Sequence, residues 1–183
     1  MTPSQQLADW IAMKHNDQVI KRSGAPYFSH LLTVAEIAGQ ATPLGYEIGL
    51  CHDLLEDTST TEAELLGALI RFGYAVRVAE AITSGVVELT DVFTRKAYPS
   101  LSKAIRKKKE HARLLTVSAI AQTVKYADIA DNINWVLKYD PKHAKTYLVK
   151  KQLLLAGLDR GAKKLRKAVL DKIRGALLTI QED

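Results

Sequence analysis

Four ionisable side chains crowd one short segment of the chain, CHDLLEDT at residues 51–58. His52 and Asp53 are adjacent, and Glu56 and Asp57 follow four residues after each of them. On a continuous helix, side chains four residues apart lie one above the other, so one imidazole and three carboxylates would project from one side. Burying these groups beside leucines is costly unless something neutralises them. The segment therefore predicts a divalent metal site.

Two further segments strengthen this prediction, because each adds a suitable ligand to a helix with an apolar face. His30 follows a Gly-Pro turn in PYFSH, and Asp128 lies in KYADIADN. With His52 and Asp53 they supply two imidazoles and two carboxylates, which leaves open positions on a six-coordinate ion. Such ligands suit Mn²⁺, Fe²⁺, Co²⁺ or Zn²⁺ better than Ca²⁺ or Mg²⁺. The alternative is a buried hydrogen-bonded pair of His52 and Asp53 without metal.

The acidic pair beside these ligands indicates hydrolysis. A cation held by neutral histidine and carboxylate lowers the pKa of water towards neutrality. Glu56 is placed to accept the proton of the attacking water, and Asp57 to orient that water or to share the task. The simpler interpretation of both carboxylates is a solvated pair at the end of a helix.

Basic residues are available to bind a phosphorylated substrate. The chain carries a net charge of +6, and eight basic residues stand against one acid between Arg95 and Arg113. Such a run attracts polyanions, either nucleic acid or a small phosphorylated molecule. We expect Lys21, Arg22 and Lys125 to stabilise a leaving diphosphate, and Asn132, four residues after Asp128, to bind ribose or base.

Hydrophobic periodicity predicts helices almost throughout, and no second strand exists to pair with a short strand at residues 86–89. The fold class is therefore all-α. Ser4 is the expected N-cap of the first helix, and Thr61 and Glu64 have the spacing of a capping box. The expected helices cover about 4–16, 28–40, 46–57, 63–71 and 74–84, one or two helices over 103–134, and two packing helices over about 141–181.

Length and composition are those of one globular domain covering residues 1–183. The sequence is 47% hydrophobic and 25% charged, which excludes a disordered chain. Its single cysteine, Cys51, cannot form an internal disulfide, and charged residues interrupt the first apolar stretch. These features predict a cytoplasmic protein with no membrane segment.

Five motifs occur in an order that resembles a known family. They are HxxQ at 15–18, SGxPYxxHxxxVA at 23–35, HDxxEDT at 52–58, FG at 72–73 and KxADxxxN at 125–132. This succession, over about residues 8–132, resembles the HD-superfamily hydrolase domain of the bifunctional alarmone synthetase/hydrolases, and especially the stand-alone small alarmone hydrolases. The family's usual Arg-Lys pair after HxxQ is represented here by Ile20 and Lys21, with Arg22 next.

The resemblance implies an HD-domain bundle of roughly eight to ten helices. It also implies removal of the 3′-diphosphate from guanosine tetra- and pentaphosphate, with Glu56 and Asp57 acting on the attacking water. The cofactor would be Mn²⁺, although another divalent transition metal is an alternative, and its ligands would be His30, His52, Asp53 and Asp128.

Two other functions stay open at this stage. One is hydrolysis of a different nucleotide or deoxynucleotide by the same HD chemistry. The other is a non-catalytic module that binds nucleic acid through the basic run, which the clustered carboxylates disfavour because they would repel a polyanion. The expected partner is thus a small phosphorylated nucleotide, and a homo-oligomer remains open.

Overall fold

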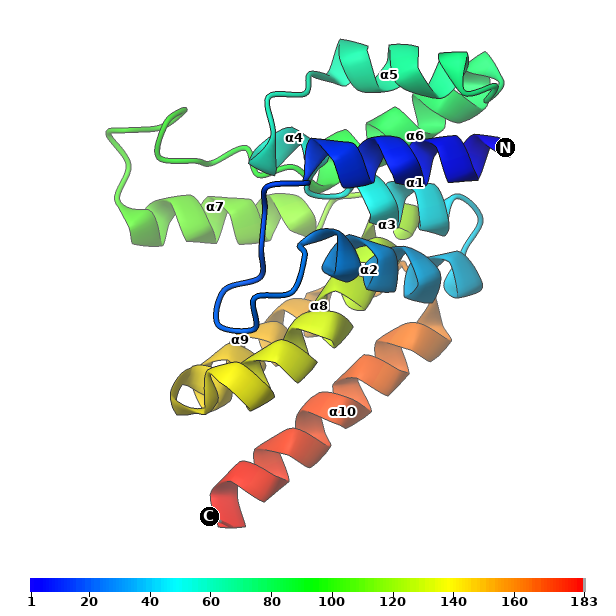
Figure 1. Ribbon diagram of the computed structural model, residues 1–183. Helices are drawn as coiled ribbons and strands as arrows, with labels where there is room; N and C mark the ends of the chain where they lie inside the picture. The colour runs from blue at the N-terminus through cyan, green and yellow to red at the C-terminus, as the bar shows by residue number, and fades with distance from the viewer. Residues whose placement is uncertain (183) are drawn as a thin grey trace.

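The computed structural model describes residues 1–182 and the side chains of residues 1–180. Within this range the chain is all-α, as predicted, and one isolated β-bridge joins Val19 to Pro26. The helices, in chain order (Figure 1), are α1 (Pro3–Lys14), α2 (Phe28–Ala41), α3 (Gly45–Cys51), α4 (Leu54–Asp57), α5 (Glu62–Arg71), α6 (Val76–Leu89), α7 (Lys103–Leu114), α8 (Ala119–Tyr139), α9 (Pro141–Gly157) and α10 (Lys163–Glu182).

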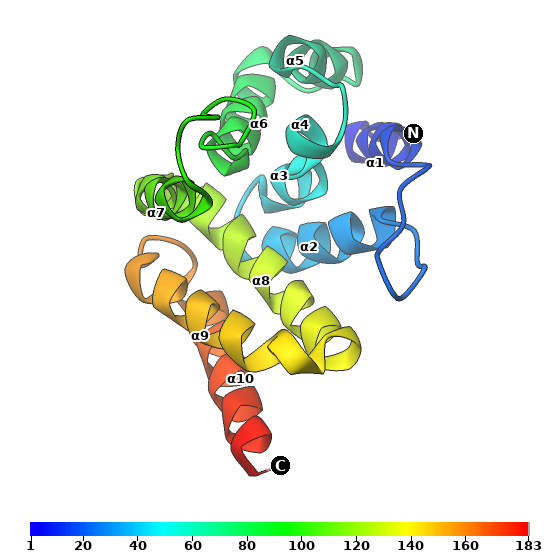
Figure 2. The ribbon, with the colours of Figure 1, turned by 90° about the vertical axis from the view of Figure 1, so that its left-hand side faces the viewer.

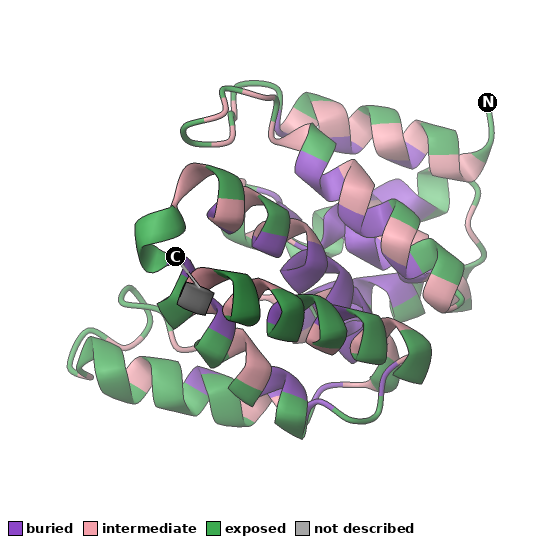
Figure 3. Ribbon diagram, turned by 90° about the horizontal axis from the view of Figure 1, so that it is seen from below, coloured by how far each residue is buried: buried purple, intermediate pink, exposed green. Residues whose placement is uncertain are grey.

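Helix α8 is the central element of the bundle. It packs against α2, α3 and α6 and also against α9 and α10, as Figure 2 shows. Its buried residues include both apolar ones, such as Val124 and Ile133, and polar ones, such as Gln122 and Asp128. Buried positions concentrate where the helices meet, and the outer faces are exposed (Figure 3). A central helix that carries polar groups can therefore place them among several neighbouring helices.

The helix starts differ in detail from the prediction. Thr2, and not Ser4, caps α1, because its hydroxyl accepts the N–H of Gln5 while the Gln5 side chain accepts the N–H of Thr2. At α5 only half of the predicted capping box forms. Thr61 accepts the N–H of Glu64, but the Glu64 carboxylate instead pairs with Lys14 at 2.7 Å.

Two longer stretches also depart from the expected boundaries. The helix expected over 74–84 is α6, which begins at Val76 and continues to Leu89 because Val86 and Leu89 pack into the core. The stretch expected to hold one or two helices over 103–134 forms two, α7 and α8, and α8 continues to Tyr139. The Ser118 hydroxyl caps α8 by accepting an N–H from Ala121. None of the described helices combines the length and the apolar character needed to span a membrane.

Helices α2 and α3 approach each other closely at Gly49. A Cβ atom at Gly49 would lie 2.9 Å from the Cα atom of Ala35 and 3.0 Å from its backbone nitrogen. Backbone atoms inside a packed helix cannot move aside as a flexible side chain can. The missing side chain therefore permits the close packing of α2, which carries His30, and α3, which His52 directly follows.

Gly49→Ala is accordingly expected to destabilise the fold by about 1–3 kcal/mol, the usual cost of overpacking. Gly175→Ala is the matched control, because nothing lies within 4 Å of a Cβ atom at that position of α10. This control should gain up to about 1 kcal/mol from the higher helix propensity of alanine. Urea denaturation measures both effects, and equal stability of Gly49→Ala and the parent protein would contradict the close contact.

Candidate metal centre

The structure brings the four predicted ligands together where α2, α3 and α8 meet. His30 lies in the first turn of α2, His52 and Asp53 directly follow α3, and Asp128 lies in the middle of α8. One ligand atom each from His30, His52 and Asp53 lies within 4.8 Å of the others. Asp128 Oδ1 is 3.6 Å from His30 Nε2 and 4.0 Å from His52 Nε2. The cluster thus joins residues that are far apart in the sequence.

Both imidazoles turn Nε2 towards the centre of the cluster. His30 Nδ1 lies 2.6 Å from Asp131 Oδ2, and His52 Nδ1 lies 2.7 Å from the carbonyl oxygen of Gly49. An Nδ1–H that donates to an acceptor leaves Nε2 free as a ligand, which is the usual arrangement of metal-binding histidines. His52 Nε2 is buried and has no hydrogen-bond partner among the described residues. These residues therefore fit a divalent cation.

The electrostatics of the cluster favour a positive charge. Burial alone would raise the pKa of Asp53, but the neighbouring His52 outweighs it and lowers the pKa to about 2. Burial likewise opposes ionisation of Asp128, yet Lys125 and both imidazoles hold its pKa below the usual range. For His52, burial lowers the pKa, whereas the carboxylates of Asp53 and Asp128 raise it to about 9. Both carboxylates are therefore ionised at neutral pH and attract a cation.

The predicted continuous helix over 46–57 is wrong. Helix α3 ends at Cys51, and α4 begins only at Leu54, because Asp53 has φ −103° and ψ 0° and interrupts the helical backbone. The carboxylates of Glu56 and Asp57 therefore do not continue the helical face that carries His52. The Glu56 carboxylate instead accepts a hydrogen bond from the backbone N–H of Asp91, in the loop after α6.

Glu56 has the acid–base character that a proton acceptor needs. Its side chain is partly exposed, but desolvation raises its pKa to about 7, and the carboxylates of Asp91 and Asp53 contribute further. The Asp91 N–H and Lys125 act in the opposite direction. Burial and Asp53 also raise the pKa of Asp57. A group that titrates near pH 7 can accept a proton at neutral pH and release it again.

The predicted substrate contacts fall into two groups. Lys125 and Asn132 lie beside the cluster, because Lys125 Nζ is 2.8 Å from Asp128 Oδ2 and the Asn132 amide donates to Asp128 Oδ1. Lys21 and Arg22 lie at the tip of the loop between α1 and α2. There the Arg22 guanidinium pairs with Asp140 at 3.0 Å.

This pairing places Arg22 at the far end of α8, about three helical turns beyond Asp128. Arg22 also donates to the carbonyl oxygen of Tyr139, and the Trp135 Nε1–H donates to the carbonyl oxygen of Lys21. The tip of the loop is thus attached to α8 and is separate from the four clustered ligands.

Two residues beside the cluster are absent from the sequence-based set. Asp131 orients His30, and the available signal was the second carboxylate of KYADIADN, three residues after Asp128. The Tyr27 hydroxyl donates to Asp53 Oδ2 at 2.5 Å, and this residue entered the sequence analysis only as part of the motif SGxPYxxHxxxVA. Burial, and then the Asp53 carboxylate, raise the pKa of the Tyr27 phenol, which therefore remains a hydrogen-bond donor.

A cationic groove of about 940 Å³ lies between α7 and α9. It extends to Asp91, whose backbone N–H donates to the Glu56 carboxylate. Its α9 wall was not predicted, because the sequence there resembles an ordinary solvated helix face. The groove is lined by many basic side chains and few acidic ones, the basic ones being Lys103, Arg106, Lys107, Lys108, Lys150 and Lys151.

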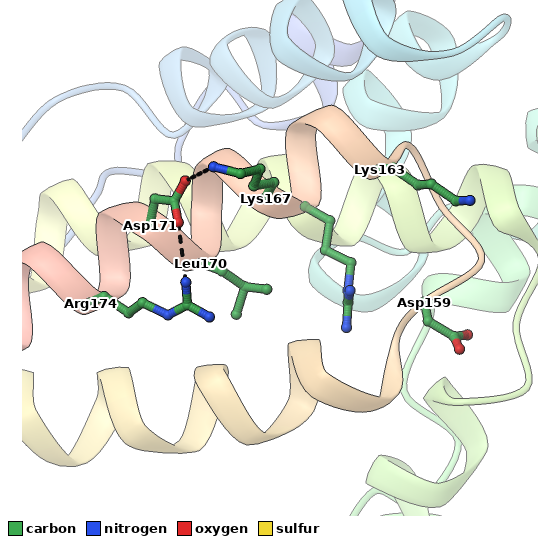
Figure 4. A pocket seen from close by; sticks show the side chains of 7 residues that line it. Asp159, Lys163, Lys167, Leu170, Asp171 and Arg174 are labelled. Atoms are coloured by element: carbon green, nitrogen blue, oxygen red, sulfur yellow. Dashed lines mark hydrogen bonds and ion pairs between the residues drawn. The ribbon is translucent and has the colours of Figure 1, made fainter.

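A second hollow, of about 470 Å³, lies beside α10 (Figure 4). Its charged groups largely satisfy one another, since Asp171 pairs with Lys167 at 2.6 Å and with Arg174 at 3.3 Å. Arg166 donates to the carbonyl oxygen of Leu155 near the end of α9. The α7–α9 groove is therefore the better candidate for an anionic ligand.

The chain shares its fold with a protein of known structure. That solved structure is described by the words "A metazoan ortholog of SpoT hydrolyzes ppGpp and plays a role in starvation responses". The TM-score is 0.75 with 22% sequence identity, and the match covers 97% of this chain and 97% of the other. No protein-family model matches the sequence, and no curated protein matches it significantly. The similarity at this identity shows a common fold.

Proposed function

We propose that this protein is a metal-dependent hydrolase that removes the 3′-diphosphate from guanosine tetra- and pentaphosphate. The observation that carries the proposal is the buried cluster, in which two imidazole Nε2 atoms and two ionised carboxylates converge. Further support comes from the fold, which is that of a protein described as hydrolysing ppGpp.

His30, His52, Asp53 and Asp128 would hold the cofactor, and Mn²⁺ suits their mixed nitrogen and oxygen atoms. A divalent cation held by these residues would polarise a phosphoryl oxygen and lower the pKa of water. In the reaction, water attacks the phosphorus bonded to the 3′ oxygen, the bond between them breaks, and the 3′ oxygen takes up a proton. The products are diphosphate and guanosine di- or triphosphate.

The protein's own side chains would handle the proton and the charge. Glu56, whose pKa is raised to about 7, would accept the proton of the attacking water, and Asp57 would help to orient that water. Lys125 would offset negative charge on the oxygens of the diphosphate group while water attacks its phosphorus. We retain Asn132 as a contact to ribose or base, and Lys21 and Arg22 as contacts to phosphate from the loop.

The α7–α9 groove supports a substrate larger than diphosphate. Its volume of about 940 Å³ leaves room for a nucleoside with further phosphates, and its lysines match their charge. A small phosphorylated nucleotide is therefore the proposed partner. The buried free thiol of Cys51 is consistent with action in the cytoplasm, which we also propose.

The direct test is a panel of nucleotides incubated with Mn²⁺. Guanosine 3′,5′-bisdiphosphate should release intact diphosphate, and rates with nucleoside or deoxynucleoside triphosphates should be lower by roughly 10⁴- to 10⁵-fold, as expected when a site binds a group that the competitor lacks. Omission of Mn²⁺ should abolish release, and Mg²⁺, Zn²⁺ and Co²⁺ measure metal preference. Comparable rates with triphosphates would favour a different HD phosphohydrolase. Absent hydrolysis with tight, salt-sensitive RNA binding would favour the binding module.

A further inference from the structure

The HxxQ motif at residues 15–18 has no part in the proposed reaction, yet it lies close to the metal centre. His15 is only 1% exposed, and its ring stacks on Tyr27. We infer that Tyr27, supported by His15 and Gln18, is a positioning residue that holds the Asp53 carboxylate in its metal-binding orientation. This inference rests on the proposed metal-dependent function.

The backbone first brings the motif and the tyrosine together. After α1 the chain forms a narrow loop in which Val19 pairs with Pro26, and the N–H of Tyr27 donates to the carbonyl oxygen of Gln18 at 2.9 Å. At the tip of the loop Arg22 and Gly24 have φ values of 68° and 72°, which reverse the chain direction. Gln18 and Tyr27 are consequently neighbours, although eight residues separate them in the sequence.

The Tyr27 side chain then reaches the inward oxygen of Asp53. Its hydroxyl donates to Oδ2 at 2.5 Å, and the same oxygen is 3.0 Å from His52 Nε2 and 4.0 Å from His30 Nε2. The phenol ring contacts the imidazoles of His15 and His30, with centroid distances of 5.6 Å in both cases. The contacts on the ring and on the hydroxyl therefore restrict both the position of Tyr27 and the orientation of the Asp53 carboxylate.

Gln18 connects this support to the acidic pair. Its Oε1 atom lies 2.8 Å from His15 Nδ1, and its Nε2 atom donates to the carbonyl oxygen of Asp57 at 2.7 Å. One amide thus holds the ring that stacks on Tyr27 and also the end of α4. Hydrogen bonds to metal-ligating groups from such outer partners commonly contribute 10- to 100-fold to metal affinity.

Tyr27→Phe tests the inference, because it keeps the ring and removes only the hydroxyl. Titration of metal-free protein with Mn²⁺ by calorimetry should show affinity weakened by roughly 10- to 100-fold. The electron paramagnetic resonance spectrum of bound Mn²⁺ should change as the Asp53 carboxylate becomes less constrained. For the nucleotide reaction at subsaturating Mn²⁺, kcat should fall while KM stays within about twofold, because Tyr27 is not placed against the substrate.

Tyr74→Phe is the matched control. It also removes a partly buried tyrosine hydroxyl, which donates to Ser4 Oγ at 3.2 Å and to Glu47 Oε1 at 3.3 Å outside the cluster. Both variants should lose similar thermal stability, but only Tyr27→Phe should lose Mn²⁺ affinity. A merely structural role of Tyr27 predicts the same Mn²⁺ affinity and the same spectrum for both variants, and that result would overturn the inference.

A second variant tests the motif itself. Gln18→Met removes both amide contacts while the Tyr27 hydroxyl is retained, and it should lower Mn²⁺ affinity in the same direction. Unchanged affinity would overturn the role assigned to Gln18. Failure of the parent protein to bind Mn²⁺ would instead contradict the proposed metal-dependent function. If the parent protein binds Mn²⁺ and Tyr27→Phe binds it with the same affinity, only the positioning role of Tyr27 is overturned.

Discussion

His52→Ala is expected to remove both the bound cation and the hydrolytic activity. His52 Nε2 is buried, has no hydrogen-bond partner among the described residues, and lies 3.0 Å from Asp53 Oδ2. The substitution removes a ligand itself. Metal affinity should therefore fall by more than the roughly 100-fold that follows from removing a ligand's hydrogen-bond partner. Metal content after dialysis and diphosphate release measure the two effects.

Thermal unfolding provides an independent measurement of the same change. Mn²⁺ should raise the melting temperature of the parent protein, because a ligand that binds only the folded state stabilises it. His52→Ala and Asp128→Asn should show no such increase. The matched control is Asp171→Asn, which removes an exposed carboxylate on α10 and should retain both metal and activity. Bound metal at the parent level in either site variant would exclude that residue as a ligand.

Glu56→Gln is expected to separate catalysis from metal binding. The substitution preserves size and keeps an oxygen that can accept the N–H of Asp91, but it removes the proton acceptor. Turnover should fall by roughly 10²- to 10⁴-fold, with Mn²⁺ still bound. Glu64→Gln, on the exposed side of α5, is the control and should keep full activity. Undiminished turnover of Glu56→Gln would show that Glu56 is a solvated surface carboxylate with no catalytic role.

The pH dependence of the hydrolytic activity should also report the ionisation of Glu56. Glu56 must be ionised to accept a proton, and its pKa is raised to about 7, so activity of the parent protein should rise as the pH increases through about 7. Asp91 and Asp53 move this limb to higher pH, whereas Lys125 moves it to lower pH. Glu56→Gln should lack the limb, and a limb of unchanged midpoint in that variant would assign it to another group.

Local spacing in the sequence predicts the helices and the candidate ligands. The apolar repeat of α2 and the Pro141 start of α9 depend on residues within one or two turns, and the structure contains both helices. His30, His52, Asp53 and Asp128 were selected by residue type and by the apolar helix positions beside them, and the family resemblance implies the same four ligands. Their convergence follows once α2, α3 and α8 pack together.

Residue spacing did not predict the contacts of side chains that bind a segment distant in the sequence. A continuous helix would have placed Glu56 above His52, but the backbone bends at Asp53, and Glu56 binds the loop after α6 instead. The position of Arg22 in the chain likewise gives no sign of its pairing with Asp140, which forms because the loop tip is attached to the end of α8.

The fold class, the metal-binding residue types and the basic character of the chain are thus readable from the sequence, since each depends on composition or on intervals of three and four residues. The direction of each imidazole, the contact of Tyr27 with Asp53 and the groove between α7 and α9 are decided only in the tertiary structure. Each of these joins elements that are distant along the chain. Their contacts depend on how closely helices pack, as at Gly49, and no local interval encodes that distance.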